Sequence, residues 1–154
     1  MPIRKARIAD VKAIQSLVND FAKREQMLPR SLNELYESVR DFIVYEDQGH
    51  IIGVCALRIM WDDLGEIRSL AVRPQDQKKG IGKQLVKRCL KEAKEIGLQR
   101  VFALTYQPFF FKKLGFHDVD KAKLPQKIWS DCIKCHKFPE CDEHAVILSL
   151  KTES

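Results

Sequence analysis

The sequence predicts one mixed α/β domain, in which a largely antiparallel sheet is flanked by helices. Strand-sized apolar runs alternate with segments whose apolar residues recur three or four positions apart, the spacing of an amphipathic helix. Hairpin signals come early, and a strand–helix–strand crossover surrounds a glycine-containing turn near the middle of the chain. No internal repeat or low-complexity linker interrupts the 154 residues, so we expect a single domain over residues 1–154.

A short strand and two helices are expected first. Residues 2–8 form the strand, and Asp10 is placed to cap the helix that follows it. The apolar face of that helix consists of Val11, Ile14, Leu17, Val18 and Phe21. After a proline-containing break, Ser31 and Glu34 have the spacing of a capping box, which predicts a second, short helix through Val39.

Three strands and a long helix follow. Residues 42–45 and 51–60 predict a hairpin around the turn residues 47–50. A third strand is expected from about residue 66 to residue 72. A helix is then expected over residues 80–97, where a glycine terminates it. Its apolar stripe consists of Ile81, Leu85, Cys89, Ala93 and Ile96.

The last part of the chain completes the crossover. Residues 101–104 are apolar throughout and predict a short, buried strand. Residues 107–114 predict one short helix that a glycine ends. Two further segments, 116–119 and 145–150, have the composition of closing strands.

The turn Gln77-Lys78-Lys79-Gly80-Ile81-Gly82 lies between a predicted strand and a predicted helix. Its glycines let the backbone approach a ligand closely, and free N–H groups at a helix start attract anions. Lys78, Lys79 and Lys83 add positive charge there. The turn therefore predicts a phosphate site, although its spacing is that of neither a P-loop nor a dinucleotide fingerprint.

This turn matches the pattern Q/R-x-x-G-x-G/A, which carries the coenzyme A diphosphate in the GNAT superfamily, and the chain resembles that family. Residues 70–72, the run 110–116 and the opening segment 3–6 are similar as well. The resemblance implies a GNAT-like sheet that splays between its fourth and fifth strands to admit pantetheine. It also implies an N-acetyltransferase that uses acetyl-CoA as co-substrate and requires no metal.

The resemblance further implies where the cofactor binds. Backbone groups of Leu70, Ala71 and Val72 would pair with the pantetheine, and Phe111 would pack against it or in the core. The diphosphate would be held by the segment Gln77, Lys78, Lys79, Gly80, Ile81, Gly82 and Lys83.

Glu66 is the candidate general base, acting through a water, because it begins the strand that carries the thioester. The alternative is an exposed glutamate that pairs with a nearby Lys or Arg. The family often has an acidic Tyr where this chain has Phe111, which has no proton to give; Tyr106 is a substitute donor. No cysteine lies where an acyl-enzyme would need it, which favours direct attack in a ternary complex.

The chain also resembles the short, stand-alone form of N-acetylglutamate synthases, in Phe111, in residues 28–31 and in the tail 124–143. That similarity implies L-glutamate as acceptor and a role in arginine biosynthesis. Guanidinium groups bind carboxylates in a forked fashion. Candidates for binding glutamate are Arg30 with Ser31, then Arg68 and Lys127, each of which has solvated surface as its alternative.

Cysteines and histidines gather in residues 120–144, a loop within the domain. Cys132, Cys135, Cys141 and His144 could bind zinc, but a single C-x-x-C pair leaves packing and redox chemistry open. Cys55 and Cys89 are expected to be buried, reduced thiols.

The charge distribution and the absence of targeting segments indicate which partners and compartment to expect. The net charge is +6, but Lys and Arg are spread along the chain, which disfavours nucleic acid as a partner. No signal peptide or membrane span is recognisable, so we expect a cytoplasmic protein. The family resemblance implies that it can form a homodimer, although no residue of the sequence indicates one. Two other functions remain open: an acetyltransferase for another small amine, peptide N-terminus or protein lysine, and a non-catalytic acetyl-CoA sensor.

Overall fold

The computed structural model describes residues 2–23, 30–120, 124 and 144–150. The described strands form one seven-stranded sheet of order β1-β2-β3-β4-β5-β7-β6. The elements in chain order are β1 (Ile3–Lys5), η1 (Ile8–Asp10), α1 (Val11–Lys23), α2 (Leu32–Glu37), η2 (Val39–Asp41), β2 (Phe42–Asp47), β3 (His50–Ile59), β4 (Leu64–Val72), η3 (Pro74–Asp76), α3 (Ile81–Glu95), β5 (Arg100–Thr105), α4 (Pro108–Lys112), β6 (His117–Asp118) and β7 (His144–Ser149). Neighbouring strands are antiparallel except β4 and β5, which confirms the predicted mixed sheet.

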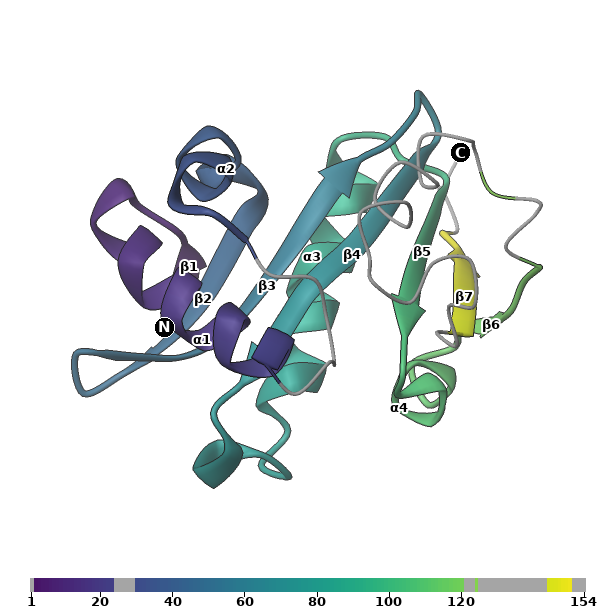
Figure 1. The fold of residues 1–154 in the computed structure, drawn as a ribbon. Helices are drawn as coiled ribbons and strands as arrows, with labels where there is room; N and C mark the ends of the chain where they lie inside the picture. Colours follow the sequence, from purple (N-terminus) through teal and green to yellow (C-terminus); the bar gives the residue numbers. More distant parts are fainter. Residues whose placement is uncertain (1, 24–29, 121–123, 125–143, 151–154) are drawn as a thin grey trace.

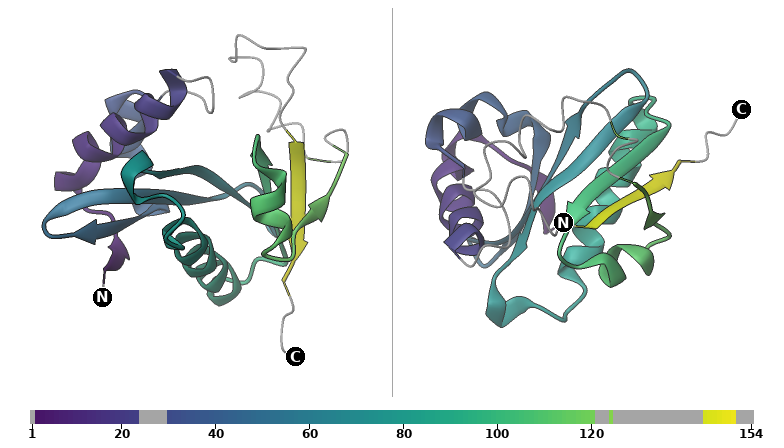
Figure 2. Two further views of the ribbon diagram at one scale, coloured as in Figure 1. Left: turned by 90° about the horizontal axis from the view of Figure 1, so that it is seen from below. Right: turned by 45° about the vertical axis from the view of Figure 1, so that its right-hand side comes forward.

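Helices cover both faces of the sheet (Figure 1, Figure 2). The stripe of α3 packs on one face, where Leu85, Cys89 and Ala93 are fully buried against residues of β3, β4 and β5. The stripe of α1 packs with Leu35 of α2 on the opposite face. Ile96, the last residue of the predicted α3 stripe, is exposed because the helix ends one residue earlier.

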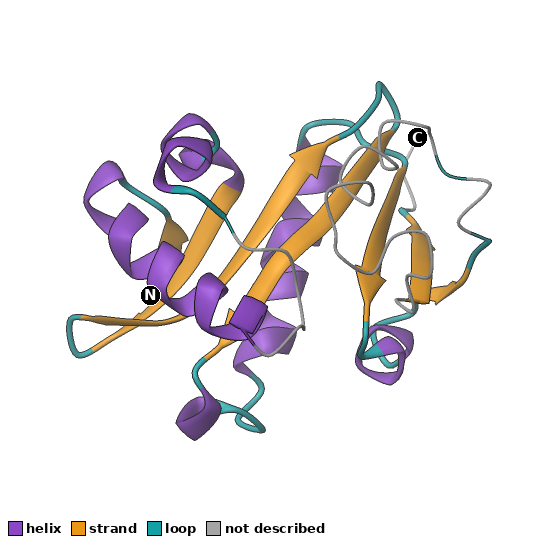
Figure 3. Cartoon of the chain, viewed as in Figure 1, coloured by secondary structure: helices purple, strands orange, loops and turns teal. Residues whose placement is uncertain are grey.

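Several predicted segments are shorter in the structure, among them the first strand and the helix before Gly115 (Figure 3). The first strand covers only Ile3–Lys5, because the chain turns into η1 at Ile8. The short helix predicted over 107–114 covers Pro108–Lys112. The hairpin prediction is confirmed, and its turn places Gln48 and Gly49 at positive φ of 50° and 79°.

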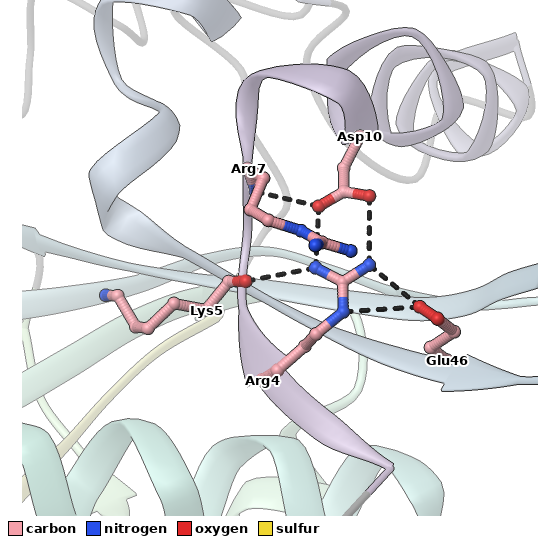
Figure 4. A network of polar contacts seen from close by, with 5 residues as sticks. All are labelled: Arg4, Lys5, Arg7, Asp10 and Glu46. Carbon is pink, nitrogen blue, oxygen red and sulfur yellow. Dashed lines mark hydrogen bonds and ion pairs between the residues drawn. The ribbon is translucent and has the colours of Figure 1, made fainter.

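Asp10 is engaged differently from the prediction. It ends η1, one residue before α1, and its carboxylate accepts a hydrogen bond from the backbone N–H of Arg7 at 2.7 Å. The same carboxylate accepts hydrogen bonds from two nitrogens of the Arg4 guanidinium, at 2.7 and 3.0 Å. Arg4 also donates hydrogen bonds to Glu46 on β2 (Figure 4). Asp10 thus ties β1 and β2 to the segment that leads into α1.

The sheet opens between β4 and β5, as predicted. Only the first three residues of β4 pair with β5, ending at Glu66 opposite Phe102. Beyond that point β4 continues beside β3, and β5 continues beside β7, so that the carboxyl ends of the two strands diverge (Figure 1). None of the described helices combines the length and the apolar run that a membrane crossing requires.

Candidate active site

A bulge in β4 lies at the point where the sheet opens. Val54 pairs with Ala71 and Ala56 pairs with Arg68, so Cys55 alone faces both Ser69 and Leu70. Ser69 has φ of 56°, a left-handed conformation that is uncommon for a residue with a side chain. The bulge turns this part of β4 away from regular pairing and leaves backbone groups beside the opening.

The larger of two cavities that share Arg68 and Ser69 fills this opening and has a volume of about 630 Å³. Its walls come from the second half of β4, the turn that follows, the start of α3, the end of β5 and α4. The predicted cofactor residues that line it are Leu70, Val72, Gln77, Lys78, Gly80, Ile81, Gly82, Lys83 and Phe111. The strand end and the turn, which are adjacent in sequence, thus face one continuous space.

Two other predicted cofactor residues point elsewhere. The side chain of Ala71 is buried against α1, so only its backbone can contribute to the opening. Lys79 places its Nζ 3.2 Å from Oδ1 of Asp76 and is not among the residues that line the cavity.

The turn has the backbone that an anion site requires. Lys78 and Gly80 have positive φ of 67° and 82°, and a Cβ on Gly80 would meet no atom within 4 Å. The first helical acceptor is the Gly80 carbonyl, which takes the N–H of Gln84. The N–H groups between these residues therefore precede the helical ladder and can face an anion.

Side chains of the same turn stabilise this conformation. The Gln77 amide donates to the Val72 carbonyl at 3.0 Å, which joins the turn to the end of β4. Asp76 is 7% exposed and accepts hydrogen bonds from Arg73 and Lys79. The Arg73 guanidinium, and after it the Lys79 ammonium, hold the pKa of the Asp76 carboxyl below its ordinary value.

Glu66 and Arg68 form a buried pair at the base of the opening. Glu66 is 6% exposed, and its Oε1 lies 3.7 Å from Nη1 of Arg68. The predicted alternative of an exposed glutamate is therefore wrong about exposure, although the pairing with an arginine is observed. Glu66 lines neither cavity; Arg68 lines both.

Tyr106 and Phe111 lie on the β5 side of the larger cavity. Phe111 is buried and packs edge-on against Phe110 and Phe116, so it serves both the cavity wall and the core. The Thr105 hydroxyl, which we did not predict, also lines the cavity and accepts the N–H of Gln107 at 2.7 Å.

A second cavity of about 270 Å³ lies between α2 and the opposite face of the sheet and shares Arg68 and Ser69 with the first. The predicted Arg30 lines it, with its guanidinium 3.5 Å from Glu34. Its backbone is bound by Asn19 of α1, which fixes its position. Arg58 lines the cavity as well and was missed.

Acidic side chains balance these arginines. Glu34, Glu37 and Asp41 line the second cavity too. Burial raises the pKa of the Asp41 carboxyl, against the opposing effect of Arg58. Ser31, predicted beside Arg30, instead caps α2, where its hydroxyl accepts the N–H of Glu34 at 3.1 Å, and it lines neither cavity.

The profile of the acetyltransferase (GNAT) family matches residues 11–116. This chain belongs to the GNAT family. That membership confirms the predicted fold and the prediction of an N-acetyltransferase.

Relatives of this GNAT chain carry acetyltransferase names. An uncharacterised N-acetyltransferase of Chlorobaculum tepidum is 41% identical over 148 residues, which cover 96% of each chain. An amino-acid acetyltransferase of Mycobacterium tuberculosis is 37% identical, over 87% of this chain and 78% of the relative.

Two solved structures are similar over nearly all of this chain. One is a Mycobacterium tuberculosis protein in complex with CoA and a second ligand, with a TM-score of 0.84, 32% identity and coverage of 97% and 99% of the two chains. The other is N-acetylglutamate synthase from Neisseria gonorrhoeae complexed with coenzyme A and N-acetyl-glutamate, with a TM-score of 0.88 and 29% identity. This chain covers 35% of that synthase.

The remaining predicted residues have mixed outcomes. Lys127, Cys132, Cys135 and Cys141 lie outside the described residues. His144 begins β7 and is exposed. Among the residues that the structure describes, no group of three or more His, Cys, Asp or Glu side chains is arranged to hold a metal ion.

The two described cysteines, Cys55 and Cys89, are free and fully buried, as expected. They lie close to one another in the core. The neighbouring Cys89 thiol, together with burial, raises the pKa of Cys55 well above its ordinary value, so Cys55 stays a neutral thiol.

Proposed function

We propose that this GNAT enzyme transfers the acetyl group of acetyl-CoA to the α-amino group of a free amino acid, with L-glutamate as the preferred acceptor. One observation carries the proposal. The larger cavity, bounded by the predicted phosphate-binding turn, and the smaller cavity, lined by three arginines, share Arg68 and Ser69 at the β4 bulge. The relatives named amino-acid acetyltransferase support the acceptor class.

The larger cavity suits coenzyme A. Its inner end exposes backbone beside the bulge, which suits the amide-rich pantetheine, and its outer end is bounded by the turn with its open N–H groups. Lys78 and Lys83 line that outer end and favour a diphosphate, whereas Lys79 contributes through Asp76. Acetyl-CoA supplies the acetyl thioester that the amine attacks directly while both substrates are bound.

The smaller cavity suits an amino acid in size and polarity. Arg30 and Arg68 have side chains only 17% and 11% exposed, and guanidinium groups at such sites bind carboxylates strongly. Arg58 is a third guanidinium on the same wall. We retain Ser31 and Lys127 as candidate substrate contacts, the former at the edge of α2.

Proton transfer is assigned to Glu66 and Tyr106. Because Glu66 is buried beside Arg68 and lines neither cavity, it would take the ammonium proton through an intervening water. Tyr106 lines the larger cavity near the end of β5 and can donate a proton to the departing thiolate. We also propose a cytoplasmic place in arginine biosynthesis, a compartment in which the free thiols of Cys55 and Cys89 remain reduced.

The carboxylates in the smaller cavity favour a second candidate acceptor. Glu34, Glu37 and Asp41 would attract an amine that carries additional positive charge. Such an acceptor would bind away from Arg30 and toward η2.

Release of coenzyme A, measured with a thiol reagent, separates these acceptors. The panel contains glutamate, glutamine, aspartate, a small diamine and a lysine peptide. We expect kcat/KM for glutamate to exceed that for glutamine at least about tenfold, because a buried guanidinium without its carboxylate loses about 1.5–3 kcal/mol. Turnover with the diamine or the peptide but not with glutamate would replace the proposed acceptor.

A further inference from the structure

Asp76 places a carboxylate in the wall of a cavity that otherwise attracts anions. It is 7% exposed and lines the larger cavity together with Lys78, Lys83 and Lys113. A negative charge beside a bound diphosphate would weaken binding by Coulomb repulsion. Asp76 is therefore expected to make a contribution to the site that outweighs this repulsion.

The contacts of Asp76 hold both ends of the segment that precedes α3. Oδ2 accepts hydrogen bonds from Arg73, whose Nε and Nη2 each lie 2.7 Å away. Oδ1 accepts from Lys79 Nζ at 3.2 Å, and the Asp76 N–H donates to the Arg73 carbonyl. One carboxylate thus links the residue after β4 to the residue before Gly80.

The linked segment contains the strained part of the turn. Lys78 has φ of 67°, which is unfavourable for a residue with a Cβ and persists only where neighbouring contacts hold it. Lys78 is followed directly by Lys79, so the Asp76–Lys79 ion pair lies immediately beside this strained residue. The pair also holds the Lys79 ammonium at the carboxylate, while Lys78 faces the cavity.

We infer that Asp76 is a positioning residue for acyl-CoA binding: its carboxylate fixes the turn so that the N–H groups before α3 point into the cavity. The inference rests on the proposed cofactor site. Repulsion and positioning predict opposite results when the charge is removed. Loss of repulsion tightens coenzyme A binding, whereas loss of the turn's geometry weakens it.

The test is Asp76→Asn, with coenzyme A binding measured by calorimetry on the whole chain. We expect the Kd for coenzyme A to rise about tenfold, since misplacing groups that contact a ligand commonly costs at least that much. We also expect the KM for acetyl-CoA to rise with kcat and the acceptor KM unchanged. A general loss of folded protein would instead lower kcat for every substrate.

Asp63→Asn is the matched control. It removes the same charge from an ion pair with Arg100, just before the start of β4 and at the opposite end of that strand from the turn, and should leave the Kd unchanged. The double variant Arg73→Gln with Asp76→Asn should bind coenzyme A no more weakly than Asp76→Asn alone. The Arg73–Asp76 hydrogen bond is already lost in Asp76→Asn, so the second substitution removes nothing further from it.

The outcomes separate this inference from the proposed function. If the unaltered chain binds no coenzyme A, both are overturned. If it binds and Asp76→Asn binds equally well or more tightly, the positioning role alone is overturned. Should Asp76→Asn fail to fold, Arg73→Gln and Lys79→Gln break the two halves of the contact separately, and unchanged affinity in both would overturn the role.

Discussion

The two cavities that meet at the β4 bulge differ in the groups that shape them: mainly backbone in the larger cavity and mainly charged side chains in the smaller one. The larger one takes its character from backbone: a split between strands, a left-handed Ser69 and a glycine turn with open N–H groups. The smaller one takes its character from side chains, with arginines and carboxylates contributed by α2, β3 and β4 and the segments beside them. A site made by backbone shape tolerates changes of side chain, whereas a site made by side chains depends on each of them.

In the proposed function, this difference corresponds to the two substrates: acetyl-CoA binds in the larger cavity and the acceptor amine binds in the smaller one. Under the proposed function the larger cavity holds coenzyme A, which the solved relatives from Mycobacterium tuberculosis and Neisseria gonorrhoeae also contain. The acceptor distinguishes one enzyme from another, and charged side chains provide that distinction.

Gly82→Trp should have the largest effect. A Cβ at Gly82 would lie 3.4 Å from Phe110, so a methyl group fits, but an indole would fill the space between α3 and α4. We expect coenzyme A binding to fall at least about 100-fold, because the ligand and the ring compete for one volume. Calorimetry measures this, and Gly82→Ala is the control that should bind nearly normally. Normal affinity in Gly82→Trp would remove the cavity from the cofactor site.

Glu66→Gln comes second and tests the residue behind the junction of the cavities. We expect kcat at neutral pH to fall about 100-fold, the contribution typical of a general base, with little change in either KM. The side chain keeps its size beside Arg68, and thermal unfolding shows whether the fold is retained. Glu95→Gln, exposed at the end of α3, is the control. An unchanged rate would make the Glu66–Arg68 pair structural.

Arg30→Ala should damage only the smaller cavity. We expect the KM for glutamate to rise at least about tenfold, since a charge-assisted hydrogen bond contributes about 1.5–3 kcal/mol. Coenzyme A affinity should not change, because Arg30 does not line the larger cavity. Arg40→Ala removes an exposed arginine nearby and should leave both constants unaltered. A parallel loss of coenzyme A affinity would mean that the two cavities are not independent.

The sequence reveals the backbone-built cavity more readily than the side-chain-built one. Gly80 and Gly82 stand in a fixed spacing between a strand pattern and a helix pattern, so local sequence is sufficient to place the turn. The split between β4 and β5 came from the family resemblance, and the structure confirms it. Ser69 was missed because nothing in a strand-like run marks a serine for positive φ.

The smaller cavity depends on contacts between distant parts of the chain. Arg58 lies opposite Glu66 only because β3 and β4 pair in one register, which the bulge then shifts. Asp41 reaches the same space because η2 ends beside β2. Lys79 was assigned to the diphosphate by proximity in sequence, and its pairing with Asp76 depends on the fold of the turn. Side-chain partners of this kind follow from tertiary structure rather than from spacing.

Asp10→Asn should have the smallest effect on activity, because Asp10 lies in neither cavity and links β1 to α1 through Arg4 (Figure 4). Its hydrogen bonds with Arg4 are the main reason that its pKa lies below the ordinary value of 3.8. The ionised carboxylate therefore stabilises the fold above that value, and the contribution is lost as the pH falls through the folded pKa.

We expect Asp10→Asn to lower the free energy of unfolding at pH 7 by about 2 kcal/mol, with kcat and both KM values unchanged. The difference from the unaltered protein should shrink progressively when urea unfolding is repeated at decreasing pH below 3.8, because protonation of Asp10 then removes the same charge. Asp47→Asn, exposed at the hairpin, is the control and should change stability little at any of these pH values. Equal destabilisation at every pH would attribute the effect to shape rather than to the charge. A loss of activity beyond the loss of folded protein would mean that the β1–α1 connection shapes one of the cavities, and the comparison of glutamate and coenzyme A affinities would show which.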